Sequence, residues 1–429
     1  MKNAKRIVHS AWRVSFRRSA AECCNALRPV ASADMSQRDE VAICQWLVER
    51  WLKFLGLTIL LVMISMMKTE YTIAQQALKS WPIFRGAPSL CGVAKVSLPD
   101  KLTLKWNYTT TDEIKSSPII VDNTVYVGSG DGFVYALNLN DGNLLWKFNT
   151  ETAIEAPPMW VKGSIIIGSL NGNLYCLNSE TGKLKWIYKT DGNIMGSANW
   201  LPASSGKPDR IIVGSYDNFL HCVSLSDGAL QWKFEAENYI NGAPAIYNGH
   251  ALFGGCDAQV RMIRLADGVE VGKVDVGSYI AGSVAVDGDE AFLGHYDNQV
   301  VCVDLQQKTV KWKYGSVDDG DPFFSTPAVV ADRIVIGGRD RFLYCLNRKD
   351  GSLMWKFRTL KDVDSSPVIC RDKVVVGSND GRLYMVKLAD GSELLSYDVG
   401  AAISASPAVV DGFVVIAAED GKVYAFGED

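Results

Sequence analysis

Apolar residues are grouped in short runs along most of the chain, and a turn signal separates each run from the next. The stretch 116–148 shows the pattern most clearly, with SSPIIVD, TVYVGS, FVYALNL and NLLWKF as successive runs. Asp131-Gly132 and Asp141-Gly142 stand between runs. Asp-Gly is a strong hairpin signal because the tight turn needs a positive φ, which glycine adopts without a steric clash. The stretch therefore predicts four short antiparallel strands.

This four-strand unit repeats along the chain at a step of about forty residues, a period typical of β-propellers. The fourth strand carries a tryptophan, which Gly272 and Leu395 replace in two units. The third strand carries a tyrosine, which His221, Arg261 and Val301 replace in three units. With eight units in all, the sequence predicts an all-β fold, an eight-bladed β-propeller of four-stranded antiparallel blades. The repeated tryptophans are Trp106, Trp146, Trp186, Trp232, Trp312 and Trp355.

The two ends of the array predict how the ring closes. The last unit stops at Asp429 after three strands, whereas LTLKWNY (102–108) stands alone before the first complete unit. We expect strand 102–108 to pair with the C-terminal three strands and to complete the eighth blade, because closure removes free sheet edges. A linear solenoid would instead need polar capping repeats at its ends.

Residues 1–80 lie outside the repeat, and residues 81–429 form the expected propeller domain. The N-terminal segment is basic over residues 1–33, and an apolar run follows at 54–67. This run is short for a membrane-spanning helix, which needs about 20 apolar residues, and it fits the core of a signal peptide. We therefore expect export to the periplasm or the cell exterior, with an uncleaved N-terminal membrane anchor as the alternative.

Charge and cysteine usage narrow the expected ligands. The chain has a net charge of −4 and no basic stripe, so nucleic acid is not an expected partner. No Cys/His spacing is typical of a metal site, so we expect no bound metal. We expect the protein to be a monomer. Cysteines follow the third-strand tyrosine register in four units, where other units have alanine or methionine, so we expect buried free thiols. These four are Cys176, Cys222, Cys302 and Cys345.

Two motifs resemble a known family. WPIFRGAPSLCGVA (81–94) precedes the ring, and units end in sequences such as CLNSETGKLKW (176–186). Over residues 81–429 the chain resembles the pyrroloquinoline-quinone-like (PQQ-like) repeat proteins, which include quinoprotein dehydrogenases and an outer-membrane β-barrel assembly lipoprotein. The resemblance implies that the repeated tryptophans dock one blade against the next, which agrees with the large area that an indole buries.

The family contains enzymes and binding scaffolds, since a fold does not fix a function. Quinoprotein alcohol dehydrogenases carry an adjacent-cysteine disulfide in the propeller and calcium ligands beneath the quinone. This chain has no Cys-Cys pair after Cys24 and no CxxCH haem motif. We therefore expect no catalytic residues, no bound PQQ or Ca²⁺, and a protein-binding scaffold in envelope or outer-membrane protein assembly. The alternatives are a PQQ-dependent alcohol dehydrogenase-like oxidoreductase and a sensory or carbohydrate-associated propeller.

One rim of the predicted ring gathers the turn between the second and third strands of every unit, and insertion 201–209 lies on the opposite rim. GSYDN (214–218) and GHYDN (294–298) replace the turn glycine with asparagine, and GGRDR (337–341) replaces it with arginine. Giving up the best turn residue indicates contacts with a partner, although asparagine itself tolerates a positive φ. The candidate partner-binding residues are Tyr216, Asp217, Asn218, Tyr296, Asp297, Asn298, Arg339 and Arg341.

Overall fold

The computed structural model describes residues 46, 80–203, 206–317 and 320–428. The chain divides into two units, 1–74 and 75–429, and the second contains all the strands described below. The predictions for residues 1–80, including the apolar run 54–67, therefore lie almost entirely outside the described residues. Among the residues that are described, no helix is long and apolar enough to cross a membrane.

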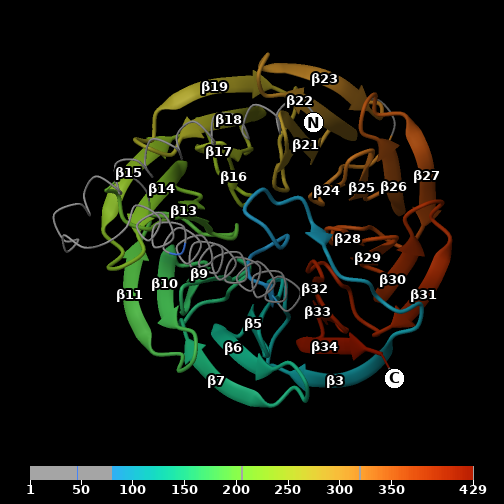
Figure 1. Cartoon of the computed structure of the whole chain (residues 1–429), viewed down its shortest axis with the longest axis horizontal. Coiled ribbons are helices and arrows are strands. Elements are labelled where there is room, and N and C mark those ends of the chain that lie inside the picture. The colour runs from blue at the N-terminus through green and yellow to red at the C-terminus, as the bar shows by residue number, and fades with distance from the viewer. Residues whose placement is uncertain (1–45, 47–79, 204–205, 318–319, 429) are drawn as a thin grey trace, which may run out of the picture. The chain divides into compact units, whose positions relative to one another are not determined.

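Eight blades surround a central axis, and each blade is a sheet of four antiparallel strands (Figure 1). This arrangement confirms the predicted eight-bladed propeller. The first strand of each blade lies nearest the axis and the fourth lies at the periphery. Two further short strands, β1 (Ser80–Trp81) and β2 (Val93–Ala94), extend the inner edges of blades 1 and 7.

The strands of the first four blades follow the repeat in order. Blade 1 contains β4 (Ile119–Val121), β5 (Thr124–Gly128), β6 (Phe133–Asn138) and β7 (Leu144–Asn149). Blade 2 contains β8 (Met159–Val161), β9 (Ser164–Gly168), β10 (Asn173–Asn178) and β11 (Leu184–Lys189). Blade 3 contains β12 (Asn199–Leu201), β13 (Arg210–Gly214), β14 (Phe219–Ser224) and β15 (Leu230–Glu235). Blade 4 contains β16 (Ala245–Tyr247), β17 (His250–Phe253), β18 (Gln259–Arg264) and β19 (Glu270–Asp275).

The last four blades continue the same order until the chain ends. Blade 5 contains β20 (Ala285–Asp287), β21 (Glu290–His295), β22 (Gln299–Asp304) and β23 (Thr309–Tyr314). Blade 6 contains β24 (Ala328–Val329), β25 (Arg333–Gly337), β26 (Phe342–Asn347) and β27 (Leu353–Arg358). Blade 7 contains β28 (Val368–Cys370), β29 (Lys373–Gly377), β30 (Arg382–Lys387) and β31 (Glu393–Asp398). Blade 8 contains β32 (Ala408–Val410), β33 (Phe413–Ala417), β34 (Lys422–Gly427) and β3 (Thr103–Thr109).

Burial explains why the second and third strands are continuously apolar, whereas apolar and polar residues alternate along the fourth strands. Every residue of β9 is buried, as expected for a strand covered by a neighbouring blade on each face. In β7, at the periphery, half-buried residues alternate with exposed ones. The core of the domain therefore lies between the faces of adjacent blades.

Strand β3 closes the ring by pairing antiparallel with β34, with Thr103 opposite Gly427 and Thr109 opposite Lys422. This is the pairing expected for strand 102–108. A second contact joins the last blade to the first, because the Ser406 amide donates to Ser117 Oγ at 2.8 Å. The same amide-to-hydroxyl contact joins blades 6 to 7 and 7 to 8 within the ring.

Each repeated tryptophan packs on a glycine of the following blade. A Cβ added to Gly142 would lie 2.6 Å from the Trp106 ring, and Gly182 approaches Trp146 equally closely. Trp106 Nε1 also donates to Leu139 O at 2.7 Å. Glycine is needed in these turns both for the positive φ, 72° at Gly142, and for the approach of the indole. The other pairs are Trp186–Gly228, Trp232–Gly268, Trp312–Gly351 and Trp355–Gly391.

Residues 80–94 lie along the inner edges of the blades, near the centre of the ring (blue in Figure 1). Strand β1 pairs antiparallel with β4, and β2 pairs parallel with β28. Between them, the chain offers carbonyl groups to the amides of the innermost strands, which would otherwise be unpaired edge groups. These bonds run to Pro82 O from Trp160, to Pro88 O from Ile246, to Ser89 O from Val286, to Cys91 O from Val329 and to Gly92 O from Ile369.

Candidate protein-binding rim

The turns between second and third strands lie against the links that lead into the innermost strands. The third residue of each turn donates its amide to the link, as in Tyr216 N to Asn193 O at 2.9 Å and Tyr296 N to Tyr279 O at 3.0 Å. Turns and links therefore form one rim, and side chains from both can share a surface.

The last residue of each of these turns has a positive φ, whether or not it is glycine. Asn218, Asn298 and Arg341 have φ values of 72°, 53° and 71°, and Ala258 has 60°. An L-residue in this region costs on the order of 1–2 kcal/mol, less for asparagine. The replacement of glycine by Arg341 is therefore a local cost that the turn itself does not require.

The aspartate of the turn in blade 3 points into the blade and has a structural role. Asp217 accepts hydrogen bonds from Phe219 N at 3.0 Å, from Asp191 N at 3.2 Å and from His221 Nε2 at 3.0 Å. Both side chains of the Asp217–His221 pair are buried. Desolvation alone would raise the pKa of Asp217, but the hydrogen bond and charge of His221 outweigh it and the pKa is lowered. Asp217 is therefore a buried blade residue and is removed from the contact surface.

The hydrogen bond between the turn aspartate and the third strand recurs in other blades, where the repeated tyrosine position supplies different donors. The turn aspartate accepts from a tyrosine hydroxyl in some blades, from His221 in blade 3 and from Arg261 Nε in blade 4, the last at 2.8 Å. The substitutions of the repeated tyrosine by histidine and arginine thus keep a donor for the carboxylate. The tyrosine pairs are Asp340–Tyr344, Asp131–Tyr135 at 2.7 Å, Asp380–Tyr384 at 2.8 Å and Asp420–Tyr424 at 2.6 Å.

Aromatic side chains from adjacent blades form a surface of two ring clusters on this rim. Tyr216 and Tyr239 stack with their ring centroids 5.0 Å apart and an angle of 3° between the planes. Tyr296 lies between Tyr279, at 6.3 Å, and Phe324, at 4.8 Å. We call this surface the tyrosine rim and define it as Tyr216, Tyr239, Tyr279, Tyr296, Phe324 and Arg339.

Arg339 closes one end of the tyrosine rim. Its guanidinium carbon lies 3.7 Å from the centre of the Phe324 ring, a cation–π contact. Its Nε and Nη2 each donate at 2.9 Å to the carboxylate of Asp364. Burial alone would lower the pKa of Arg339, but the bond to Asp364 raises it. The arginine is thereby held in one orientation on the aromatic face.

Three of these aromatic rings are open to solvent: Tyr239 is 47% exposed, Tyr279 54% and Tyr296 45%. Exposed large aromatic residues that lie together indicate an interaction surface. Sequence comparison of the turns found Tyr216, Tyr296 and Arg339, which the structure brings to this surface. It missed Tyr239, Tyr279 and Phe324, which lie in the links. Comparing the links NYINGAP, SYIAGSV and PFFSTP across the repeat would have found them.

The other predicted residues of the turns lie beside the tyrosine rim rather than within it. Asp297 and Arg341 are exposed, and Asn218 is half-buried. Asn298 donates from Nδ2 to Ser316 O at 3.1 Å, which ties its turn to a link.

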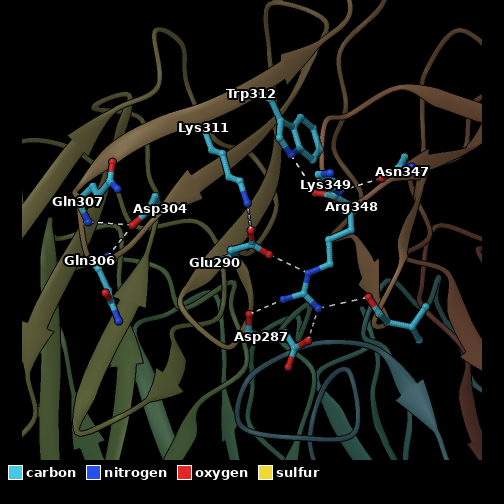
Figure 2. Close-up of polar contacts among 11 residues, drawn as sticks. Asp287, Glu290, Asp304, Gln306, Gln307, Lys311, Trp312, Asn347, Arg348 and Lys349 are labelled. Carbon is cyan, nitrogen blue, oxygen red and sulfur yellow. Dashed lines mark hydrogen bonds and ion pairs between the residues drawn. The ribbon is translucent and has the colours of Figure 1, made fainter.

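The opposite rim carries a cluster of charges between blades 5 and 6 (Figure 2). Arg348 Nε donates to Glu290 Oε2 at 2.8 Å, and Lys311 also contacts Glu290. Arg348 contacts Asp287 as well, so two cations meet two carboxylates. Burial would raise the pKa of Glu290, but the bonds from Lys311 and Arg348 lower it. Within the described residues, no three His, Cys, Asp or Glu side chains are grouped as metal ligands would be.

Comparison with solved structures shows relatives of the same fold. BamB from Moraxella catarrhalis has 17% identity and a TM-score of 0.63 over 76% of this chain and all of that one. The quinohemoprotein alcohol dehydrogenase ADHIIG from Pseudomonas putida HK5 has 12% identity and a TM-score of 0.69 over 83% of this chain and 81% of its own. A europium-containing methanol dehydrogenase has 11% identity and a TM-score of 0.68 over 84% of this chain and all of its own. At these identities the likeness shows the fold alone.

A search of curated proteins finds no match. The model of one family does match, over residues 100–204 and 256–429, and it describes the outer membrane protein assembly factor BamB. The matched ranges cover blades 1, 2 and 5 to 8 and the closing strand β3. The chain belongs to the BamB family of PQQ-like repeat β-propellers.

Proposed function

We propose that this protein is a non-catalytic scaffold that binds a protein partner through the tyrosine rim, in the assembly of the cell envelope. The exposure of three tyrosine rings on adjacent links, beside an arginine held on Phe324, carries the proposal. Tyrosine and arginine are enriched in interfaces, where they supply large contact area and polar ends. Membership of a family named for an outer membrane assembly factor supports the setting.

Contacts within the tyrosine rim prepare it for binding. Stacking fixes Tyr216 on Tyr239, and Asp364 fixes Arg339. Side chains that are already ordered lose less conformational entropy when a partner docks. Exposed Asp297 and Asp321 border the surface, and we expect them to favour a partner with basic residues at the matching edge.

The central axis supports a scaffold rather than an axial cofactor. In the quinoprotein dehydrogenases that this fold resembles, acidic and amide side chains hold calcium beneath the quinone. In this chain, residues 80–94 run along the inner edges at the axis. Among the described residues, no three metal-ligating side chains are grouped there or elsewhere, so the proposal includes no cofactor. We also propose that the protein lies outside the cytoplasm, because the apolar run 54–67 fits the core of a signal peptide.

Site-specific photocrosslinking tests the proposed face. A crosslinking amino acid replaces Tyr279 or Tyr296, and in the control it replaces Gln307, which is exposed on the opposite rim. We expect envelope proteins to crosslink at positions 279 and 296 and not at 307, with the attached peptide identified by mass spectrometry. Crosslinks at 307 alone would show that the other rim binds the partner.

A triple substitution measures the contribution of the rim to affinity. Tyr239, Tyr279 and Tyr296 changed together to Ala should weaken binding of the crosslinked partner at least about tenfold, or 1.4 kcal/mol, with melting little changed. The matched control changes three exposed leucines of outer strands, Leu145, Leu230 and Leu353, to Ala. Equal binding by the two triple variants contradicts the proposal. Binding of a soluble glycan would favour the carbohydrate-associated alternative, and a bound quinone in the visible spectrum would favour the oxidoreductase.

A further inference from the structure

We propose that the centre of this propeller binds a small monovalent anion, of the halide class, at Arg85. Arg85 belongs to the axial segment between β1 and β2, and it is 1% exposed. Its Nε, Nη1 and Nη2 atoms are all buried, and none has a hydrogen-bond partner among the residues that the structure describes. A buried cation with no partner is the observation that calls for an anion.

Two other arginines, the half-buried Arg348 and the buried Arg261, show how this fold compensates a guanidinium with carboxylates. The buried Arg210 differs from both, since its Nη1 donates to Leu265 O and its Nε has no partner among the described residues. Arg348 donates to Glu290 Oε2 and to Asp287 O, both at 2.8 Å (Figure 2). Arg261 is buried and contacts three carboxylates, those of Asp257, Glu237 and Glu270. Arg85 is more deeply buried than Arg348 and has no such carboxylate.

The charge on Arg85 persists at neutral pH. Burial lowers the pKa of its guanidinium to about 9, and the nearby Cys91 acts in the opposite direction. The group is therefore protonated at pH 7. An ion removed from water without a counter-ion or hydrogen bonds carries a large desolvation cost, which a bound anion offsets through charge-assisted hydrogen bonds.

Cys91 does not supply the missing negative charge. Its Sγ donates to Val286 O at 3.0 Å and accepts from Ser89 Oγ at 3.4 Å. Burial raises the pKa of the Cys91 thiol, so the sulfur is neutral at physiological pH. Cys91 therefore leaves Arg85 without a counter-charge.

The axial segment is shaped around this guanidinium. Gly92 has a φ of 64°, and a Cβ at this position would lie 1.9 Å from Arg85 Nη2. The Gly92 amide donates to Arg85 O at 3.2 Å and closes the loop behind the side chain. One guanidinium balances one negative charge, which favours a halide over a divalent oxyanion that would itself be left partly uncompensated.

Diffraction from crystals grown with bromide tests the site directly. We expect an anomalous bromide peak within hydrogen-bond distance of the Arg85 guanidinium in the parent protein. Ordered water with no anomalous signal at this position would overturn the proposal. The measurement uses the full propeller and does not depend on whether the tyrosine rim binds a partner.

Melting in matched salts tests the same site in solution. At equal ionic strength, sodium bromide should raise the Tm of the parent by roughly 3 °C over sodium gluconate, whose anion is much larger than a halide. Arg85→Met should lose this difference. Arg348→Met, which removes a paired arginine, should lower Tm in both salts and keep the difference. An equal bromide effect in Arg85→Met contradicts the proposal, and if that variant does not fold, the anomalous diffraction from the parent decides.

Discussion

The side chain of Lys308 covers Gly272, where other blades place a tryptophan. A Cβ on Gly272 would lie 2.9 Å from Lys308 Cδ and Cε, and Lys308 Nζ donates to Val271 O at 2.5 Å. Lys308 has a φ of 56° and stands in the turn of blade 5 where docking needs glycine. Blade 4 therefore lacks its tryptophan at the place where the next blade lacks the glycine that would receive it.

The third strand compensates for the volume of the missing indole. Met262 lies opposite Gly272, and Met385 lies opposite Leu395, the other unit without tryptophan. Opposite the tryptophans stand alanine or cysteine, as in Ala136 opposite Trp146 and the four cysteines of this register. Leu395 faces blade 8, whose fourth strand is β3 from the start of the propeller. No turn therefore joins the third and fourth strands of blade 8, and blade 8 has no turn glycine to receive a tryptophan. Tryptophan, glycine and small residue therefore occur together or not at all.

Transplanting the standard docking set into blade 4 tests this relationship. Gly272→Trp alone should destabilise the protein by roughly 2 kcal/mol or more, because the indole would overlap Met262 and Lys308. Combining it with Met262→Cys and Lys308→Gly should restore the free energy of unfolding to the parent value or above it. Urea denaturation measures both, and additive losses in the triple variant would show that the three positions are independent.

The indole hydrogen bond contributes to docking in blade 2 and not in blade 3. Trp186 Nε1 donates to Leu225 O at 2.9 Å. Trp232 Nε1 is buried without a partner in the described residues, and Arg210 donates to Leu265 O at 2.8 Å. Trp186→Phe should therefore cost about 1 kcal/mol more than Trp232→Phe, the net contribution of one hydrogen bond. Equal losses in chemical denaturation would mean that ring packing alone determines the cost of each substitution.

The third-strand cysteines should be inert in the native protein. Cys176, Cys222, Cys302 and Cys345 are unpaired and buried, as predicted. Burial raises the pKa of Cys222, Cys302 and Cys345 to about 12, and only a thiolate reacts readily. Labelling followed by mass spectrometry should leave these four unmodified until denaturant is added. The half-buried Cys256 serves as the comparison and should react first.

His295 should make stability depend on pH near neutrality. Burial, and next the Lys313 ammonium, lower the pKa of His295 below its ordinary value. The unfolded chain then takes up a proton below about pH 6.5, at a pH where the folded protein does not. The free energy of unfolding should therefore rise with pH across this window and fall on acidification.

His295→Ser isolates that effect, because Ser129 and Ser215 occupy the same turn position and their hydroxyls accept from the turn amide as His295 Nδ1 does. The variant should show a flatter dependence of Tm on pH between 7 and 5 than the parent. An unchanged slope in His295→Ser would assign the dependence to other groups.

The sequence by itself determined the architecture of this protein, because in a propeller each unit repeats the same local signals. Asp-Gly turns such as Asp141-Gly142, the short apolar strands and the lone strand 102–108 specify the blades and their closure through contacts between neighbours in the repeat. It also identified Tyr216, Tyr296 and Arg339, because each departs from a pattern that other units preserve.

Only the tertiary structure decided what depends on residues far apart in the chain. The burial of Asp217 follows from its pairing with His221, and the aromatic surface arises because links and turns from different blades meet on one rim. The unpartnered Arg85 is likewise invisible in sequence, where FRG is only part of the motif at 81–94. Its isolation results from the path of residues 80–94 along the inner edges of the closed ring, a path that single-sequence periodicity does not encode.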